Sequence, residues 1–137
     1  DIGLMHVHPG MLPDLRGADC SLWSSLITGR LSASAFWMAP GIDEGKLIET
    51  AWLPRIDFSL AEGRYDLKTI YRAFYAFVDP WVRARLLCET LHRHPALAAV
   101  EGRQQDLSLG ETYYFMHPLM QRFAFERMGL IQSAVEG

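Results

Sequence analysis

Residues 2–13 read IGLMHVHPGMLP, and this stretch decides how the rest of the chain is interpreted. The run from Ile2 to His8 is short and mostly apolar, and it stops at a Pro-Gly pair. Such a run is typical of a buried strand in a parallel sheet. His6 and His8 are two positions apart, and alternate side chains of a strand point to the same face. We therefore expect both imidazoles to reach one site at the end of this strand.

The segments that follow predict helices packed against a sheet. Residues 9–17 hold two prolines and two glycines and predict a shaped loop. A helix is expected from the N-cap Asp19 to Gly29. Strands are expected at 32–38 and at 46–53, with an extension of the second strand to residue 58 left open. The remaining expectations are a long helix from Asp66 that Pro80 interrupts, a helix over about 81–92, an irregular stretch over 102–110, and a last helix over 118–128 that Gly129 stops.

Composition narrows the class of protein. The chain has 137 residues, half of them hydrophobic, which indicates one compact domain with a real core. A net charge of −3 argues against a general nucleic-acid surface, and no apolar run reaches the roughly 18 residues of a membrane span. No signal peptide is visible, and Cys20 and Cys88 form no disulfide framework, so we expect a cytoplasmic protein with buried, inert thiols. Because a strand pattern begins at once and without Met, we also expect the chain to be part of a larger protein.

Two further motifs stand at a defined distance from the histidines. Residues 16–19 read RGAD and residues 41–45 read GIDEG, so His8 and Asp43 are 35 positions apart. This order resembles that of the folate-dependent formyltransferases, which carry an Asn-x-His-Pro strand end, a Ser-Leu-Leu-Pro loop, an Arg-Gly or Lys-Gly turn, and a Gly-Ile-Asp-x-Gly turn about 35 residues further on. Gln104 or Gln105, followed by Thr112-Tyr113, looks like the family's Gln…Thr-Tyr stretch. The similarity covers roughly residues 3–115.

The resemblance implies a fold and a reaction. The fold is α/β, a three-layer formyltransferase-like (Rossmann-like) sheet with flanking helices, and residues 1–137 would be the second half of the catalytic domain, without its N-terminal strands. The activity implied is that of an enzyme, a formyltransferase. It moves a formyl group from 10-formyltetrahydrofolate, its cosubstrate, to an amine of a small molecule, sugar or aminoacyl acceptor. By the same resemblance, the site lies at the carboxyl end of a parallel strand, where open α/β sheets bind ligands.

The chemistry of that reaction suits three of these side chains. An amine attacks the formyl carbon, and each donor aimed at the resulting oxyanion is typically worth about 3–4 kcal/mol. A proton must leave the amine, and a positioned His performs such transfers near neutral pH. We assign this proton transfer to His8 and the oxyanion donor to His6. Asp43, in a turn that Gly41 and Gly45 allow to fold tightly, would fix the His8 tautomer and raise its pKa.

The resemblance also supplies residues that contact folate or substrate: Gly10, Leu12, Pro13, Arg16, Gly17 and Ile42. This sequence departs from the family pattern at two of its positions. His6 stands in place of the Asn and offers one N–H donor whose position depends on the tautomer. Gly10 stands in place of the Ser, which removes a hydroxyl or leaves room for a bulkier ligand. Arg16 contacts an anionic ligand or pairs with a nearby carboxylate, and the sequence does not choose between these.

Several alternatives stay open. His6, His8 and Asp43 are also a set that could hold zinc or iron, but the surrounding motif favours the folate interpretation, and we assign no metal. Water could replace the amine, which would make a formyltetrahydrofolate hydrolase, or the chain could be a non-catalytic binding module. A tRNA acceptor stays open as well.

Other notable side chains have structural interpretations. His92 and His94 complement a helix end, and Thr112 and Tyr113 pack. Three interpretations stay open for one aromatic group, which is core, forms the subunit interface of a homodimer, or lines an acceptor pocket: Tyr71, Phe74, Tyr75, Phe77 and Trp81.

Overall fold

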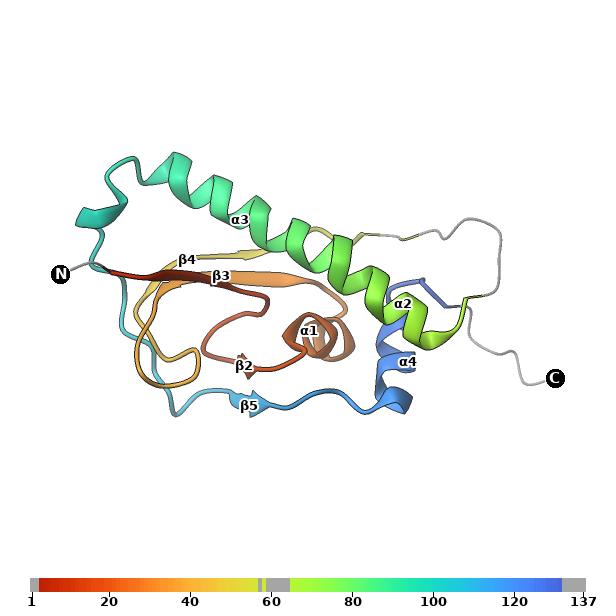
Figure 1. The fold of residues 1–137 in the computed structure, drawn as a ribbon. Coiled ribbons are helices and arrows are strands. Elements are labelled where there is room, and N and C mark those ends of the chain that lie inside the picture. Colours follow the sequence, from red (N-terminus) through yellow and green to blue (C-terminus); the bar gives the residue numbers. More distant parts are fainter. Residues whose placement is uncertain (1–2, 57, 59–64, 132–137) are drawn as a thin grey trace.

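The computed structural model describes residues 3–56, 58 and 65–131. Three strands form a sheet of order β1-β3-β4, namely β1 (Met5–His8), β3 (Ser32–Trp37) and β4 (Leu47–Trp52). Helix α3 (Asp79–Arg93) covers one face of this sheet. Helix α1 (Cys20–Thr28) and the paired strands β2 (Leu15–Gly17) and β5 (Glu111–Tyr113) lie beyond the other face (Figure 1). This arrangement is the predicted three-layer α/β fold with flanking helices.

The direction of the first strand differs from the prediction. β1 runs antiparallel to β3, with His8 opposite Ser34, and β3 runs antiparallel to β4. The predicted parallel pairing is therefore wrong for the neighbour that the structure describes. A short apolar run is compatible with either direction, and the loop and helix between residues 9 and 31 reverse the chain before β3 begins. Among the described strands, parallel pairing occurs between β2 and β5.

Helix α1 begins and ends close to the predicted positions, but the start works differently. Asp19 occupies the N-cap position in a left-handed conformation with φ of 53°, and its carboxylate does not cap the helix. Instead it accepts hydrogen bonds from the Tyr71 hydroxyl at 2.9 Å and from the backbone N–H of Met116 at 2.8 Å. Asp19 therefore joins three separate segments. Gly29 ends the helix as predicted, with φ of 73°.

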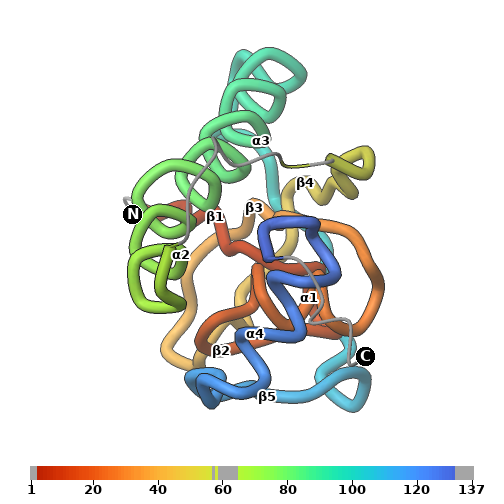
Figure 2. The backbone as a smooth tube through the Cα atoms, turned by 90° about the vertical axis from the view of Figure 1, so that its right-hand side faces the viewer, coloured from red at the N-terminus to blue at the C-terminus, as the bar shows by residue number. Residues whose placement is uncertain are grey.

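The predicted break at Pro80 is absent. Helix α2 (Leu67–Ala73) starts after Asp66, whose side chain accepts from Thr69 N–H, and passes through a π-helical segment (Phe74–Val78) into α3. Figures 1 and 2 show the three as one continuous rod. Pro80 lies in the first turn of α3, where a missing N–H and a fixed φ are tolerated. The proline therefore coincides with a change in hydrogen-bond pattern, not with a helix end.

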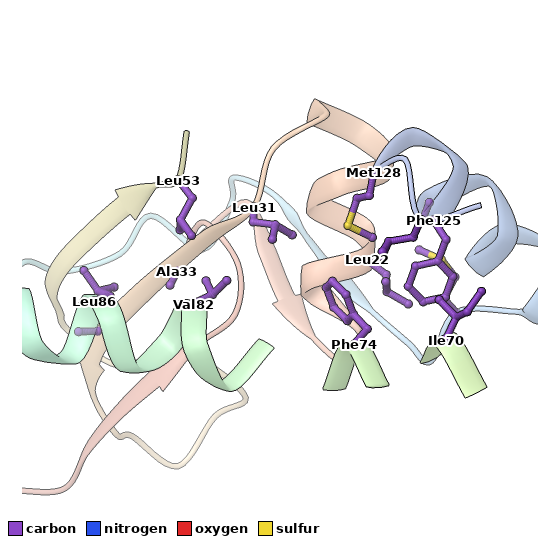
Figure 3. Packing of buried hydrophobic residues seen from close by; sticks show 14 residues of the cluster. Leu22, Leu31, Ala33, Leu53, Ile70, Phe74, Val82, Leu86, Phe125 and Met128 are labelled. Atoms are coloured by element: carbon purple, nitrogen blue, oxygen red, sulfur yellow. The ribbon is translucent and has the colours of Figure 1, made fainter. Parts of the chain in front are cut away.

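The largest core cluster joins the rod, the sheet, α1 and α4 (Pro118–Arg127). Figure 3 shows Leu22 of α1 between Phe74 of the rod and Phe125 of α4. Of the predicted aromatic group, Phe74 is buried, whereas Phe77 is 75% and Trp81 48% exposed, so core packing accounts for only part of it.

Three smaller expectations have clear outcomes. Strand β4 ends at Trp52, and residues 53–56 and 58 are not strand. Residue 57 lies outside the described residues, as does Ile2 at the start of the first expected strand. Cys20 is buried as expected, but Cys88 is exposed, because it lies on the solvent side of α3. A short 3-10 segment (Leu97–Ala99) follows α3, whose last turn carries His92 as predicted.

Candidate active site

His8 ends β1 and is buried, with 2% of its surface exposed. Its Nε2 lies 2.7 Å from the carbonyl oxygen of Leu15, a distance that requires an N–H on this nitrogen. Its other nitrogen, Nδ1, lies 3.4 Å from Oδ2 of Asp43. The Leu15 carbonyl thus places the proton on Nε2, and in the neutral ring the lone pair of Nδ1 faces the carboxylate. The prediction that Asp43 fixes the tautomer of His8 is therefore wrong, because the Leu15 carbonyl fixes it.

Burial decides the charge of this imidazole. Desolvation lowers the pKa of His8 below its ordinary value, and the opposing effect of the Asp43 carboxylate, which raises it, is smaller. The predicted net increase of the His8 pKa is accordingly wrong, because the sequence did not reveal how completely the ring would be buried. A neutral ring with a free lone pair on Nδ1 is what a general base requires.

Asp43 lies in the turn over residues 41–45 and has a left-handed backbone with φ of 57°. Its Oδ2 accepts a hydrogen bond from the backbone N–H of Gly17 at 2.8 Å. Gln105, which is buried, donates from Nε2 to the carbonyl oxygens of Asp43 at 2.8 Å and Gly45 at 2.6 Å. A Cβ on Gly45 would lie 1.5 Å from the Trp37 carbonyl oxygen, so this position requires glycine, as predicted. The turn is therefore anchored from both its backbone and its carboxylate.

His6 shares the face of His8 on β1 and is half-buried. Its ring meets Phe36 edge-on, with 5.6 Å between the ring centroids. One ligand atom from each of His6, His8 and Asp43 lies within 4.8 Å of the other two. The structure thus brings together the three side chains that the sequence singled out as catalytic.

Three of the predicted binding residues pack or form hydrogen bonds inside the protein, around the loop over residues 9–17. Gly10 is packed against Cys20 and the His8 ring, and Leu12 is buried with Phe36 and Leu47. Arg16 is buried and donates from one nitrogen to the carbonyl oxygens of Pro13 and Leu109, both at 3.0 Å. Neither an anionic ligand nor a carboxylate is needed to explain it.

The other three binding candidates differ in exposure. Gly17 is half-buried beneath the Tyr113 carbonyl. Pro13 is also half-buried, and Ile42 is 64% exposed. These two side chains are the ones of the predicted set that a ligand could contact at the surface.

Three contributors to the site were not assigned a role from sequence. Leu15 acts through its carbonyl, which no sequence pattern reveals. Ser34 accepts from the backbone N–H of Leu12 at 2.9 Å and donates to the Gly10 carbonyl at 2.7 Å, so it holds the loop after His8. A serine inside an otherwise apolar strand is a usable signal, because buried hydroxyls need partners. Gln105 was noted only as a match to the family, together with Gln104, and the structure identifies it as the residue that contacts the turn.

A cavity of about 260 Å³ lies elsewhere, beside α2 and the π-helical segment. Phe74 and Phe77 line it, and none of its lining residues belongs to the site around His8. Tyr113 packs on Trp23, with 5.0 Å between ring centroids, in agreement with the predicted packing role. Within residues 3–56, 58 and 65–131, none of the helices combines the length and apolar character that crossing a membrane requires.

Comparison with known proteins supports the fold through structure alone. No family model and no curated protein matches the chain. The formyltransferase PseJ from Anoxybacillus kamchatkensis, solved with UDP-4,6-dideoxy-4-formamido-L-AltNAc and tetrahydrofolate, is 21% identical with a TM-score of 0.56, over 81% of this chain and 52% of its own. A sugar N-formyltransferase from a Shewanella species is 16% identical with a TM-score of 0.55, over 93% and 52%.

A third match lies in a longer protein. HypX from Aquifex aeolicus is 13% identical with a TM-score of 0.56, over 90% of this chain and 23% of its own. The chain spans about half the length of the two formyltransferases that it matches. The structural similarity to these three proteins shows that the chain has the formyltransferase-like fold that the motifs predicted.

Proposed function

We propose that this chain carries the proton-transfer pair for moving a formyl group from 10-formyltetrahydrofolate to an amine on a sugar-type acceptor. The observation that carries the proposal is the environment of His8. One ring nitrogen is held by the Leu15 carbonyl at 2.7 Å, and the other presents its lone pair beside the Asp43 carboxylate at 3.4 Å. A neutral, oriented imidazole next to a carboxylate is suited to accept a proton from an attacking amine.

Each residue has one role in this proposal. His8 accepts the proton at Nδ1 and returns one to the departing folate nitrogen. Asp43 stabilises the imidazolium that forms, because its Oδ2 lies next to the protonated nitrogen. His6 donates from its ring to the developing negative charge on the formyl oxygen, as oxyanion donors do in other acyl transfers.

The donor and acceptor classes rest on the fold and on the matched structures. Bound folate would supply the activated formyl group. The site of this chain fits the reacting end of that reaction, since a buried base, a carboxylate and a ring N–H donor converge within 4.8 Å. PseJ was solved with tetrahydrofolate and a formamido sugar nucleotide, which supports the same classes here. Because the chain spans about half of PseJ, folate binding and formyl transfer both remain part of the proposal.

The test is a formyl-transfer assay on the protein that carries this sequence, with 10-formyltetrahydrofolate and nucleotide-linked amino sugars. Release of tetrahydrofolate that depends on the amine is expected. Asp43→Asn should lower turnover by at least about 10²-fold, because the imidazolium loses its counter-charge. Glu44→Gln, at the exposed neighbouring carboxylate, is the matched control and should retain activity.

Other outcomes identify the competing functions. Formate release without any amine would indicate a hydrolase. No turnover with any acceptor, together with thermal stabilisation by a reduced folate, would indicate a binding module. Near-normal turnover in Asp43→Asn would contradict the assignment of the pair.

A further inference from the structure

We propose that His6, His8 and Asp43 also form a binding site for a divalent transition-metal ion, with Zn²⁺ the favoured species. The site uses residues of the candidate active site but does not depend on formyl transfer. His6 is what creates it, because the formyltransferase pattern has an Asn at that position. Two same-face imidazoles and one carboxylate are ligands that Zn²⁺ accepts in three-ligand sites, where a fourth position stays open.

The spacing of the two inner ligands suits such an ion. In a tetrahedral site with bonds of 2.0–2.1 Å, two ligand atoms are separated by about 3.3 Å. Nδ1 of His8 and Oδ2 of Asp43 are 3.4 Å apart. The third ligand comes from His6, which offers one ring nitrogen within 4.8 Å of the ligand atoms of His8 and Asp43, and this ring is half-buried on the same strand face as His8.

The charges around Nδ1 favour a cation. Nε2 of His8 carries the proton because it donates to the Leu15 carbonyl, so the neutral ring turns a lone pair towards a carboxylate oxygen. Two electron-rich atoms that face each other at this distance repel unless positive charge lies between them. A metal ion binds the neutral imidazole directly, through the ring nitrogen that carries no proton.

Both ligands already have the outer hydrogen bonds that metal ligands usually have. A ligating histidine commonly donates its second N–H to a carbonyl, and ligating carboxylates are themselves hydrogen-bonded. The Leu15 carbonyl fills the first role for His8, and the Gly17 N–H fills the second for Asp43 at 2.8 Å. Both contacts come from β2, so one strand holds the ligand on β1 and the ligand in the turn over residues 41–45.

The identity of the ion follows from the ligand set. Mg²⁺ and Ca²⁺ prefer oxygen ligands, whereas two imidazoles favour Zn²⁺ or its spectroscopic substitute Co²⁺. A bound ion would occupy the Nδ1 lone pair that proton transfer needs. Micromolar Zn²⁺ is therefore expected to inhibit the proposed formyl transfer rather than to support it.

The test is metal binding by the protein without a polyhistidine tag. Titration with ZnCl₂ should give one bound ion per chain, and CoCl₂ should give visible absorption typical of a low-coordinate site, whereas MgCl₂ should give neither. His6→Asn should lower the Zn²⁺ affinity by at least about 10²-fold, since loss of a direct ligand exceeds the 10–100-fold effect of an outer partner. His92→Asn, on α3 and outside the cluster, is the matched control and should bind normally.

The result that overturns the proposal is absence of Zn²⁺ binding at micromolar concentration, or binding that His6→Asn leaves unchanged. Circular dichroism of the His6→Asn protein verifies that the fold is retained, and Asp43→Asn provides a second variant with the same expected loss. If Zn²⁺ does not bind but Asp43→Asn still abolishes formyl transfer, only the metal site fails. If Zn²⁺ binds to a protein without transferase activity, only the proposed function fails.

Discussion

The carboxylate of Asp43 accepts a hydrogen bond from the backbone N–H of Gly17, 26 positions earlier in the chain, at 2.8 Å. This bond joins the turn over residues 41–45 to β2, and the same oxygen faces Nδ1 of His8. The Arg-Gly and Gly-Ile-Asp motifs are therefore in direct contact. The hydrogen bond holds the Asp43 carboxylate with the same oxygen 3.4 Å from Nδ1 of His8.

Replacing Gly17 with Ala should destabilise the protein by about 2–4 kcal/mol, because it combines backbone strain with a steric clash. Gly17 has φ of 96°, and a Cβ there would lie 2.2 Å from the Tyr113 carbonyl oxygen. Urea unfolding measures the loss. Gly129→Ala is the matched control, since Gly129 has φ of 78° but its nearest contact is at 3.4 Å, so only the strain of about 1 kcal/mol should remain. Equal losses in both variants would show that the clash with β5 is relieved.

Replacing Gln105 with Leu should loosen the turn that carries Asp43. The side chain keeps a similar size, but the carbonyl oxygens of Asp43 and Gly45 lose their donor, at a cost of about 1–3 kcal/mol. If the proposed function holds, turnover falls more than stability alone predicts, because Asp43 is no longer held beside His8. The exposed neighbour provides the control, and Gln104→Leu should change neither property. An identical effect of both substitutions would contradict a role for Gln105 in the turn.

The sequence predicted the parts of this site that depend on residue order. Two histidines at alternate strand positions had to share a face, and the His8–Asp43 spacing matched a known pattern, so the two side chains were expected to meet. The features that the sequence did not predict are the burial of a side chain and the orientation of a backbone carbonyl. The burial of His8, which lowers its pKa, and the Leu15 carbonyl, which sets its tautomer, are consequences of tertiary packing.

For the helix boundaries too, the sequence predicted what depends on local residues and missed what depends on the rest of the fold. Gly29 marks the end of α1 because a left-handed residue there closes the last turn, a local effect that sequence reveals. Asp19 looked like a local cap, yet its carboxylate is used by Tyr71 and Met116, which are 52 and 97 positions away. Pro80 looked like a break, but the preceding π-helical segment leaves it in a first turn. Long-range partners therefore overrode the local signal at Asp19, and the hydrogen-bond pattern of the adjoining π-helical segment overrode the signal at Pro80.

The two cysteines should differ strongly in reactivity. Cys20 is fully buried, and desolvation, assisted by nearby carboxylates, raises the pKa of its thiol to about 12. Only the thiolate is nucleophilic, so almost no reactive form exists at pH 8. Cys88 is exposed on α3. Iodoacetamide at pH 8 should therefore modify Cys88 in the native protein and reach Cys20 only after unfolding in urea. Mass spectrometry of the peptides measures this, and native labelling of Cys20 at the rate of Cys88 would contradict the packing around α1.

Among the carboxylates outside the candidate site, Asp79 should be the one whose removal destabilises the protein most. It is 2% exposed, accepts from the Ser21 hydroxyl at 2.7 Å, and pairs with Arg83 at 2.9 Å, so it joins the start of α3 to α1. Asp79→Ala leaves a buried hydroxyl and a guanidinium without their acceptor, at an expected cost of about 2–4 kcal/mol in urea unfolding. We expect the loss to lie in the lower part of that range, because Arg83 is 37% exposed and water screens its charge.

Two variants separate the hydrogen bond of Asp79 from its charge. Asp79→Asn keeps an acceptor for Ser21 and loses only the ion pair, so it should cost less than Asp79→Ala. Glu89→Ala removes the exposed pair with Arg85, which has the same i, i+4 spacing, and should cost no more than about 0.5 kcal/mol. If Asp79→Ala were no more destabilising than Glu89→Ala, the contact between α1 and α3 would rest on apolar packing alone. A large loss in Asp79→Ala with a small loss in Asp79→Asn would identify the Ser21 hydrogen bond as the interaction that holds the two helices together.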